Sequence, residues 1–374
     1  MTGDRLRVVV CEPYYTGSHR SWADGLAAHS RHDIRLVTHT GGFWKWRMQG
    51  AALTLARAVR DTVAGWGRPD VLVASDMVHL PALLGFLRGD LAGVPVVLYL
   101  HENQLGYPTA DGRSPDETYA MTNWLSVAVA DRVVFNSEYH RRDLSSRLPA
   151  LLRRFPDHRH DDALDDALAR SEVVPIGIDT ARFAGDRRTP GAPPLVLWNH
   201  RWEYDKDPAT FFAALDAVDR AGVPFRLAVA GESFQTVPDE FERAHARFGD
   251  HIVQFGTASD EEYPGLLASS DVVVSTARHE FFGVAVAEAM AAGAPPLLPN
   301  RLSYPELVPA PRPYLYGEGE LVERLCWALT DHAGRRAAAA GSRAHVDRFG
   351  WRNVAPRYDA LLEEVAGLAR GGDR

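Results

Sequence analysis

The chain has 374 residues and a formal net charge of -8, and 46% of its residues are hydrophobic. This length allows about two or three domains with sizeable cores, and the composition is that of a soluble globular protein. Two cysteines, Cys11 and Cys326, exclude a disulfide framework, and both are expected to be reduced. Neither a signal peptide nor an apolar run of about eighteen residues is found, so we expect a cytoplasmic protein without a membrane span.

Short β-rich runs alternate with helical stretches along the whole chain. The expected strands of the first half are 6–11, 34–38, 71–74, 94–100, 132–136 and 172–176. Those of the second half are 195–198, 225–230, 252–256, 271–275, 295–298 and 314–315. This alternation predicts an α/β protein with two Rossmann-like, doubly wound parallel sheets. Ligands would bind beyond the carboxyl ends of the strands, in a cleft where the two domains face each other.

A segment rich in proline and glycine, 186–194, interrupts the alternation. Such a composition is typical of a linker. We therefore expect an N-terminal domain over residues 1–185 and a C-terminal domain over residues 195–350. The last helix, within 351–374, is expected to pack back onto the first domain.

Polar residues and a glycine follow two strands of the first half. The first strand leads into Gly17, which would let a sugar or a phosphate approach the backbone closely, although a plain strand-to-helix turn explains the same residue. Polar side chains at the carboxyl end of a parallel sheet favour a ligand site over a simple turn. After the strand 94–100 these side chains are His101, Glu102, Asn103 and Gln104.

The strand 195–198 leads into a loop with two cations, Arg201 and Lys206, ahead of a helix expected over 208–220. A departing nucleoside diphosphate develops negative charge, which a guanidinium and an ammonium can stabilise without a metal ion. The alternative is a solvated loop in which both cations pair with neighbouring carboxylates. These carboxylates are Glu203, Asp205 and Asp207.

The fragment 279–288 places Glu280 and Glu288 on either side of a junction between a strand and a helix expected over 284–292. The first amides of a helix have no internal partner and favour an anion such as a diphosphate. We expect Glu280 to hold a transferred hexose and Glu288 a ribose, because carboxylates accept hydrogen bonds from vicinal hydroxyl groups. Two unrelated surface glutamates are the alternative. The same donor loop contains Phe282, Gly283, Val284 and Ala285.

The spacing of these glutamates resembles the signature of retaining GT-B glycosyltransferases, a large group that includes sucrose synthases and bacterial mannosyltransferases. Longer motifs are similar to the tRNA-queuosine α-mannosyltransferase group, from about residue 6 to about residue 316. The motifs lie at 12–19, 43–47, 101–104, 135–137, 156–159, 200–208 and 279–285. The acidic stretch 161–166 and the C-terminal helices do not align with the pattern of that group.

The resemblance implies a GT-B fold and the transfer of mannose from GDP-mannose to a cyclopentenediol hydroxyl of queuosine in a tRNA anticodon, with retention at the anomeric carbon. Protein groups in such a front-face transfer mainly position and stabilise, while the departing phosphate oxygen deprotonates the acceptor. His101 would line the reaction centre, although a satisfied histidine in a tight turn is an alternative. No metal or other cofactor is expected, since the sequence has no HExxH or CxxC motif. The catalytic set is His101, Arg201, Lys206 and Glu280.

Cations and aromatic residues of the first half favour contact with RNA, although the net charge argues against indiscriminate binding. The expected tRNA contacts are Ser18, His19, Trp44, Lys45, Trp46, Arg47, Glu102, Asn103, Gln104, Arg153, Arg154, His158 and Arg159. A lipid acceptor is an alternative, because a basic helix near 141–154 would suit anionic lipid equally well. A small-molecule acceptor and a non-catalytic nucleotide-binding or RNA-binding protein are the others. The sequence leaves the donor base and the oligomeric state open.

Overall fold

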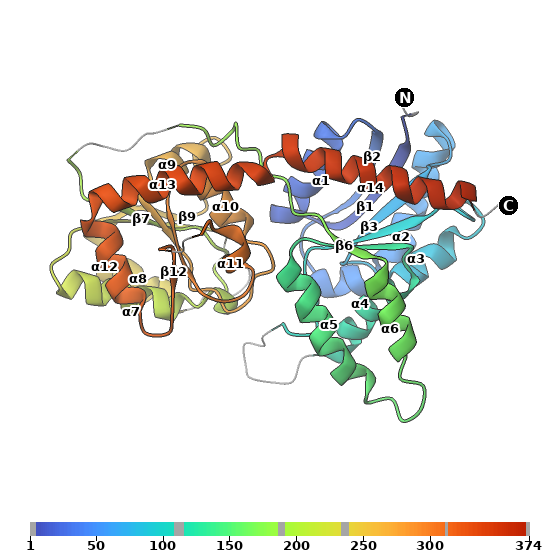
Figure 1. The fold of residues 1–374 in the computed structure, drawn as a ribbon, viewed down its shortest axis with the longest axis horizontal. Helices are drawn as coiled ribbons and strands as arrows, with labels where there is room; N and C mark the ends of the chain where they lie inside the picture. The colour runs from blue at the N-terminus through green and yellow to red at the C-terminus, as the bar shows by residue number, and fades with distance from the viewer. Residues whose placement is uncertain (1–4, 108–115, 186–190, 233–238, 311–312, 372–374) are drawn as a thin grey trace. The chain divides into compact units, whose positions relative to one another are not determined.

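The computed structural model describes residues 5–107, 116–185, 191–232, 239–310 and 313–371 (Figure 1). Contacts divide the chain into two compact units, Met1–Gly177 with Trp351–Arg374 and Ile178–Gly350. This division falls before the expected boundary at residue 185, because the Ile178 N–H already donates to the Phe349 carbonyl of the second unit. The expected linker 186–194 therefore belongs to the second unit, and its residues 186–190 lie outside the described ones.

The first unit is built on six parallel strands in the order β2-β1-β3-β4-β5-β6. These strands are β1 (Arg7–Tyr15), β2 (Asp33–Thr40), β3 (Val71–Ser75), β4 (Val96–Leu100), β5 (Arg132–Phe135) and β6 (Ser171–Val173). The helices are α1 (Gly17–His29), α2 (Trp44–Trp66), α3 (Leu80–Leu87), α4 (Glu117–Val129), α5 (Glu138–Leu152), α6 (Asp161–Ala169) and α14 (Trp351–Gly371). Both β3 and β4 are buried over their whole length, as central parallel strands between helices should be.

The C-terminal helix α14 packs against α1 of the first unit. Trp351 requires two glycines, since a Cβ on Gly25 or Gly177 would come within 2.2 Å of its indole ring. Farther along α14, the Trp22 indole N–H donates to the Tyr358 hydroxyl at 3.0 Å. The last segment of the chain thus completes the core of the unit that contains its beginning.

The second unit has another sheet of six parallel strands, in the order β12-β11-β10-β7-β8-β9. Its strands are β7 (Leu195–Trp198), β8 (Arg226–Ala230), β9 (Ile252–Gly256), β10 (Val272–Val274), β11 (Pro296–Pro299) and β12 (Leu315–Tyr316). Its helices are α7 (Pro208–Arg220), α8 (Asp239–Phe248), α9 (Tyr263–Ser269), α10 (Val284–Ala291), α11 (Tyr304–Leu307), α12 (Leu321–Thr330) and α13 (His332–Val346), with short 3-10 turns at Tyr204–Lys206, Gly249–His251 and Asp347–Phe349. An aromatic core fixes the loop after β7, where Trp202 stacks on Phe241 with ring centroids 4.2 Å apart.

Each of the twelve strands overlaps a strand expected from the sequence, and α7 has the expected bounds. The strand β1 differs, because it continues past residue 11 to Tyr15, which pairs with Thr40 of β2 after a register shift. Glu12 is therefore a fully buried strand residue and not part of the following turn. Among the described residues, no helix is both long and apolar enough to cross a membrane.

Candidate functional site

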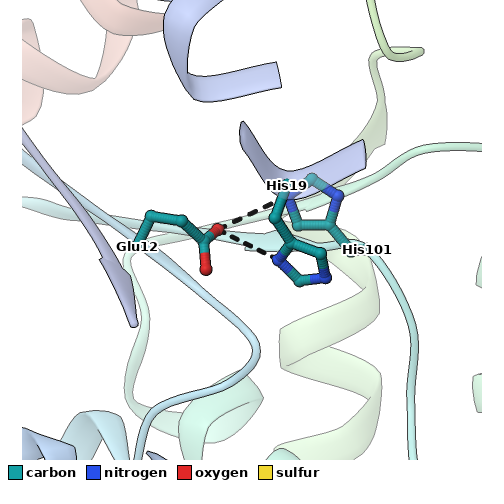
Figure 2. Close-up of side chains that lie close together, drawn as sticks. All are labelled: Glu12, His19 and His101. Carbon is teal, nitrogen blue, oxygen red and sulfur yellow. Dashed lines mark hydrogen bonds and ion pairs between the residues drawn. The ribbon is translucent and has the colours of Figure 1, made fainter. Parts of the chain in front are cut away.

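The carboxyl edge of the first sheet collects polar side chains from three neighbouring strands. Glu12 lies in β1, Asp76 follows β3 and His101 follows β4, and parallel strands end at the same edge of their sheet. Figure 2 shows the Glu12 carboxylate facing two imidazole rings, those of His101 and of His19 in α1. The Glu12 Oε2 atom lies 3.1 Å from His19 Nδ1 and 3.7 Å from His101 Nε2. The two rings stack with centroids 3.9 Å apart.

The two histidines carry different charges at neutral pH. Burial lowers the pKa of His19, but the Glu12 carboxylate and further carboxyl groups outweigh it and raise the pKa to about 9. Burial and the adjacent His19 cation hold the pKa of His101 well below its usual value. His19 is therefore an imidazolium ion that donates to Glu12, while His101 is a neutral imidazole.

The backbone around His101 is satisfied, but its side chain is not. The His101 N–H donates to Asp76 Oδ1 at 2.8 Å, and the Asn136 amide donates to the His101 carbonyl at 2.8 Å. Both ring nitrogens of His101 are buried, and neither has a hydrogen-bond partner among the described residues. The alternative of a satisfied histidine in a tight turn therefore does not hold.

Among the other predicted residues of this loop, some support the loop itself and one remains available to a ligand. The buried Asn103 donates to Asp143 at 3.2 Å and accepts from Leu105, so it shapes the loop. Gln104 is also buried, and its amide donates to the half-buried Glu102 at 2.8 Å. Asn103 is thus a structural residue, whereas Glu102 remains available to a ligand.

The turn before α1 contains the remaining predicted residues of this edge. Gly17 has a φ of 49°, in the region that favours glycine, and open space surrounds the position of a Cβ. Ser18 is half-buried in the first turn of α1 and His19 is buried. The backbone at Gly17 is thus exposed and within reach of a ligand.

The start of α2 presents exposed aromatic side chains. Trp46 is 73% exposed, and Phe43, which the expected set of contacts did not include, is 70% exposed. Phe43 also has a φ of 53°, which is uncommon for a residue other than glycine. Trp44 packs on Tyr119 with ring centroids 5.0 Å apart. Trp44 therefore anchors the helix start, while Phe43 and Trp46 point away from the core.

The remaining predicted basic residues of the first unit are exposed or bound to the backbone. Arg47 donates to the Thr40 carbonyl at 3.1 Å, and Lys45 is exposed. Arg154 forms an ion pair with Glu117 of α4. A basic surface follows α5, formed by Arg153, Arg154, His158 and Arg159, all of them exposed.

In the second unit, the loops after β7 and β10 lie side by side because these strands are neighbours. Lys206 is buried between them, and its Nζ donates to the His279 carbonyl at 2.8 Å and to Glu280 Oε2 at 3.4 Å. Asp205, one of the carboxylates that the alternative pairs with these cations, lies 3.2 Å from the same ammonium. Lys206 is thus not on a solvated loop. The alternative of a solvated cation paired with a carboxylate holds for Arg201, which is 38% exposed and lies 3.5 Å from Glu203.

Glu280 and Lys206 stabilise each other in their charged forms. Burial opposes the ionised Glu280, but the Lys206 ammonium, with further contributions, lowers the pKa of the carboxyl group. Burial likewise opposes the charged Lys206, and the Asp205 and Glu280 carboxylates raise its pKa above the usual value. The Phe281 and Phe282 N–H groups, at 3.2 and 3.4 Å from Oε1, also fix the Glu280 carboxylate.

The helix α10 begins at Val284 after Gly283, whose φ of 96° favours glycine. A Cβ at Gly283 would approach side-chain atoms of Leu307 and Tyr304 at 3.3 Å. The first amides of α10, including those of Val284 and Ala285, have no partner within a helix and suit an anion. The Phe282 ring is buried against Phe349 and does not line an open site, so its expected donor contact is limited to the backbone.

Glu288 is supported by two residues that the sequence did not indicate. The Tyr263 hydroxyl donates to Glu288 Oε2 at 3.0 Å, and the Asn199 amide donates to Tyr263 at 3.1 Å. Asn199 also donates to the Ala285 carbonyl in α10. Burial raises the pKa of Glu288 to about 7, against the hydrogen bond from Tyr263. No local pattern marks these residues, because they come from three separate elements.

One group in the described part of the chain has ligand atoms close enough to share a metal ion, namely Glu12, His19 and His101, within 4.8 Å of one another. A metal requires deprotonated ligands. The raised pKa of His19 and its hydrogen bond to Glu12 keep the proton on this imidazole, so the group does not fit a metal in this form.

Two family models match the chain, one described as tRNA-queuosine alpha-mannosyltransferase N-terminal over residues 7–178 and one as Glycosyl transferases group 1 over residues 180–340. The chain is 33% identical over 320 residues to a tRNA-queuosine alpha-mannosyltransferase of Drosophila melanogaster, covering 83% of each chain. It is 29% identical over 393 residues to a GDP-mannose:cellobiosyl-diphosphopolyprenol alpha-mannosyltransferase of Xanthomonas oryzae, covering 99% of this chain and 90% of that protein.

Solved structures agree on the fold. The sucrose-phosphate synthase of Thermosynechococcus elongatus matches with a TM-score of 0.73 and 18% identity, covering 97% of this chain and 100% of that one. The catalytic domain of starch synthase IV from Arabidopsis thaliana matches with a TM-score of 0.74 and 12% identity, over the same shares of the two chains. The fold is thus GT-B, and the chain is a glycosyltransferase that belongs to the tRNA-queuosine α-mannosyltransferase family.

Proposed function

We propose that this enzyme transfers mannose from GDP-mannose to a cyclopentenediol hydroxyl of queuosine in a tRNA anticodon loop, with retention at the anomeric carbon. The observation that carries the donor half is the buried Lys206–Glu280 pair beside the start of α10. The relative from Drosophila melanogaster, named for tRNA-queuosine, supports the acceptor. The relative from Xanthomonas oryzae, named for GDP-mannose, supports the donor.

The second unit holds the groups that a nucleotide-sugar requires. The diphosphate binds at the first amides of α10, with Arg201 and Lys206 supplying positive charge. Glu280 accepts hydrogen bonds from the hexose hydroxyls, and its two backbone donors keep it in place. Glu288, oriented by Tyr263, accepts from the ribose. These fixed charges stabilise the departing diphosphate as the glycosidic bond breaks.

No metal ion is part of this proposal. Two cations and a helix N-terminus already face the position where negative charge develops on the diphosphate. The departing phosphate oxygen takes the proton of the acceptor hydroxyl, so a separate base is not needed. His101 is a neutral imidazole of the first unit, and we assign it to the acceptor in this proposal.

The RNA contact is assigned to the start of α2 and to the basic surface after α5. Phe43 and Trp46 are the two most exposed large hydrophobic side chains among the described residues; Phe43 directly precedes α2, and Trp46 lies in its first turn. Exposed aromatic rings beside a cation such as Lys45 are suited to stacking on unpaired bases. From the proposed tRNA acceptor we also infer a cytoplasmic enzyme.

The direct test incubates the enzyme with a nucleotide-sugar and tRNA, followed by mass analysis of the nucleosides. Matched tRNAs carry either queuosine or guanosine at the same position, and GDP-mannose is compared with GDP-glucose and UDP-glucose. We expect queuosine to gain one hexose, only from GDP-mannose and only in the queuosine tRNA. Donor hydrolysis without any glycosylated nucleoside, or transfer to lipid instead of tRNA, would reject the proposed acceptor.

A further inference from the structure

We propose that the carboxyl edge of the first sheet is a binding site for a cationic diol, in which Glu12, Asp76 and Glu102 compensate a protonated amine and His101 hydrogen-bonds to a neighbouring hydroxyl. This inference rests on the proposed function and deepens it. It assigns the recognition of the acceptor to charge and not only to the shape of its ring.

The first observation is an excess of carboxyl groups over cations. Glu12 lies 3.1 Å from His19, and Asp76 accepts from the backbone N–H of His101, whose ring stacks on that of His19. The pKa of His19 is raised by Glu12, Asp76 and Glu102 together. Glu12 and Asp76 are buried, at 0% and 1% exposure. His101 adds no positive charge, since it is neutral. Buried carboxylates without matching cations are costly, so this arrangement favours a ligand that carries a positive charge.

The pKa of Asp76 also indicates an excess of carboxyl groups. Burial, and then the Glu102 and Glu12 carboxylates, raise the pKa of Asp76 to about 8 despite the opposing His19 cation. Asp76 therefore holds a proton at neutral pH when the site is empty. A ligand cation next to Asp76 would leave its burial unchanged but oppose the effect of the two neighbouring carboxylates, and so favour the ionised form.

The second observation is independent of charge. The His101 side chain is only 3% exposed, and its Nε2 faces the Glu12 carboxylate at 3.7 Å (Figure 2). Among the described residues, neither ring nitrogen of His101 has a hydrogen-bond partner. Buried polar atoms normally have a hydrogen-bond partner, so an unpaired imidazole at a ligand site indicates a missing ligand atom. A neutral imidazole has one donor and one acceptor, which match a hydroxyl group that both donates and accepts.

Queuosine has the required chemistry. It is a deazaguanosine whose cyclopentenediol ring is attached to the base through a secondary amine, which is protonated near neutral pH. The positive charge and the hydroxyl groups of queuosine are therefore direct neighbours, just as the carboxyl groups and the His101 imidazole are neighbours in the site. Guanosine lacks both, so the same contacts would separate modified from unmodified tRNA. A metal ion is a poorer occupant, because the proton on His19 would first have to leave.

The test uses two modified acceptors that differ in charge but hardly in size. Queuosine tRNA is N-methylated, which keeps the amine cationic, or N-formylated, which makes it neutral. We expect kcat/KM for the N-methyl tRNA to stay within about threefold of that for queuosine tRNA, and kcat/KM for the N-formyl tRNA to fall at least about tenfold. Equal use of both derivatives would overturn the inference and leave the proposed function intact. Failure of queuosine tRNA itself would instead reject the proposed function.

Two protein variants assign the effect to the cluster. Glu102→Gln keeps the shape of a half-buried side chain but removes its charge, so the preference for the N-methyl over the N-formyl tRNA should shrink at least about threefold. Asp165→Asn removes the same charge from an exposed position of α6 and should leave the preference unchanged. Donor hydrolysis should be normal in Asp165→Asn, which lies outside the proposed site. An unchanged preference in Glu102→Gln, or an acceptor KM that responds to zinc or to EDTA, would contradict the assignment.

Discussion

Replacing Glu280 by alanine removes a carboxylate that lies 3.4 Å from the Lys206 ammonium and beside the start of α10. In the proposed reaction, this carboxylate holds the hexose while the diphosphate departs. The contact is strongest when charge develops, because two backbone N–H groups fix the carboxylate in advance. Turnover should therefore fall more than the affinity for the donor.

The size of the loss follows from comparison with other fixed polar contacts. Removing one such contact from an active site costs about 2.7–4 kcal/mol in the transition state, or roughly a hundredfold to a thousandfold in kcat. The fold should survive, because the buried Lys206 keeps the Asp205 carboxylate at 3.2 Å and the His279 carbonyl at 2.8 Å. Loss of a hydrogen bond to a charged group costs at most about 3 kcal/mol of stability.

The assay measures transfer of mannose to queuosine tRNA at saturating donor and acceptor, together with urea denaturation of each variant. Glu318→Ala, at an exposed position of the same unit, is the matched control and should retain wild-type turnover. Glu280→Gln should remain impaired more than tenfold, since an amide lacks the charge. If folded Glu280→Ala turns over within about twofold of the wild type, the assignment of Glu280 to the sugar site is wrong.

Other expectations concern pH, RNA and metal ions. Because the Glu12 carboxylate raises the pKa of His19 to about 9 in the folded state, against about 6.5 in the unfolded chain, this histidine stabilises the fold fully below pH 6.5. This contribution, about 3 kcal/mol, is lost as the pH rises towards 9. In urea denaturation, the free energy of unfolding of His19→Gln should therefore depend less on pH than that of the wild type. Arg153→Glu combined with Arg154→Glu should raise the KM for tRNA at least about tenfold and flatten its salt dependence while donor hydrolysis stays normal; an unchanged KM would remove this surface from the RNA contact. Trp46→Ala should weaken tRNA binding by about 1–3 kcal/mol in a filter-binding assay, and equal binding would argue against base stacking. EDTA should leave transfer unchanged, whereas inhibition that a divalent ion reverses would contradict the metal-free proposal.

The local geometry around the proposed donor residues was largely predictable from the sequence. Glu280, Gly283 and Glu288 lie on one strand-to-helix junction, whose geometry follows from a buried strand, a glycine and a helix start. The same holds for Lys206, which lies on a short loop after β7. Two parallel sheets were likewise predictable, since strand and helix alternate along the chain.

Only the tertiary structure decided which of these residues share an environment. It buried Lys206 between Asp205 and Glu280, placed Tyr263 on Glu288, and turned the Phe282 ring into the core. Hydrophobic periodicity cannot predict such contacts, because the partners come from elements that are distant in the sequence. The sequence predicted that the last helix packs onto the first domain, but only the structure showed that two glycines leave room for the Trp351 ring there.

The cluster at the first sheet makes this difference clearest. His19, His101 and Glu102 were predicted site residues, whereas Glu12 was named only as part of the motif after the first strand and Asp76 follows another strand without a recognisable motif. Parallel strand order brings the carboxyl ends of β1, β3 and β4 together, although long crossovers separate them in the chain. The local geometry around each residue can therefore be predicted from the sequence, whereas the charge balance of a site depends on which strands become neighbours.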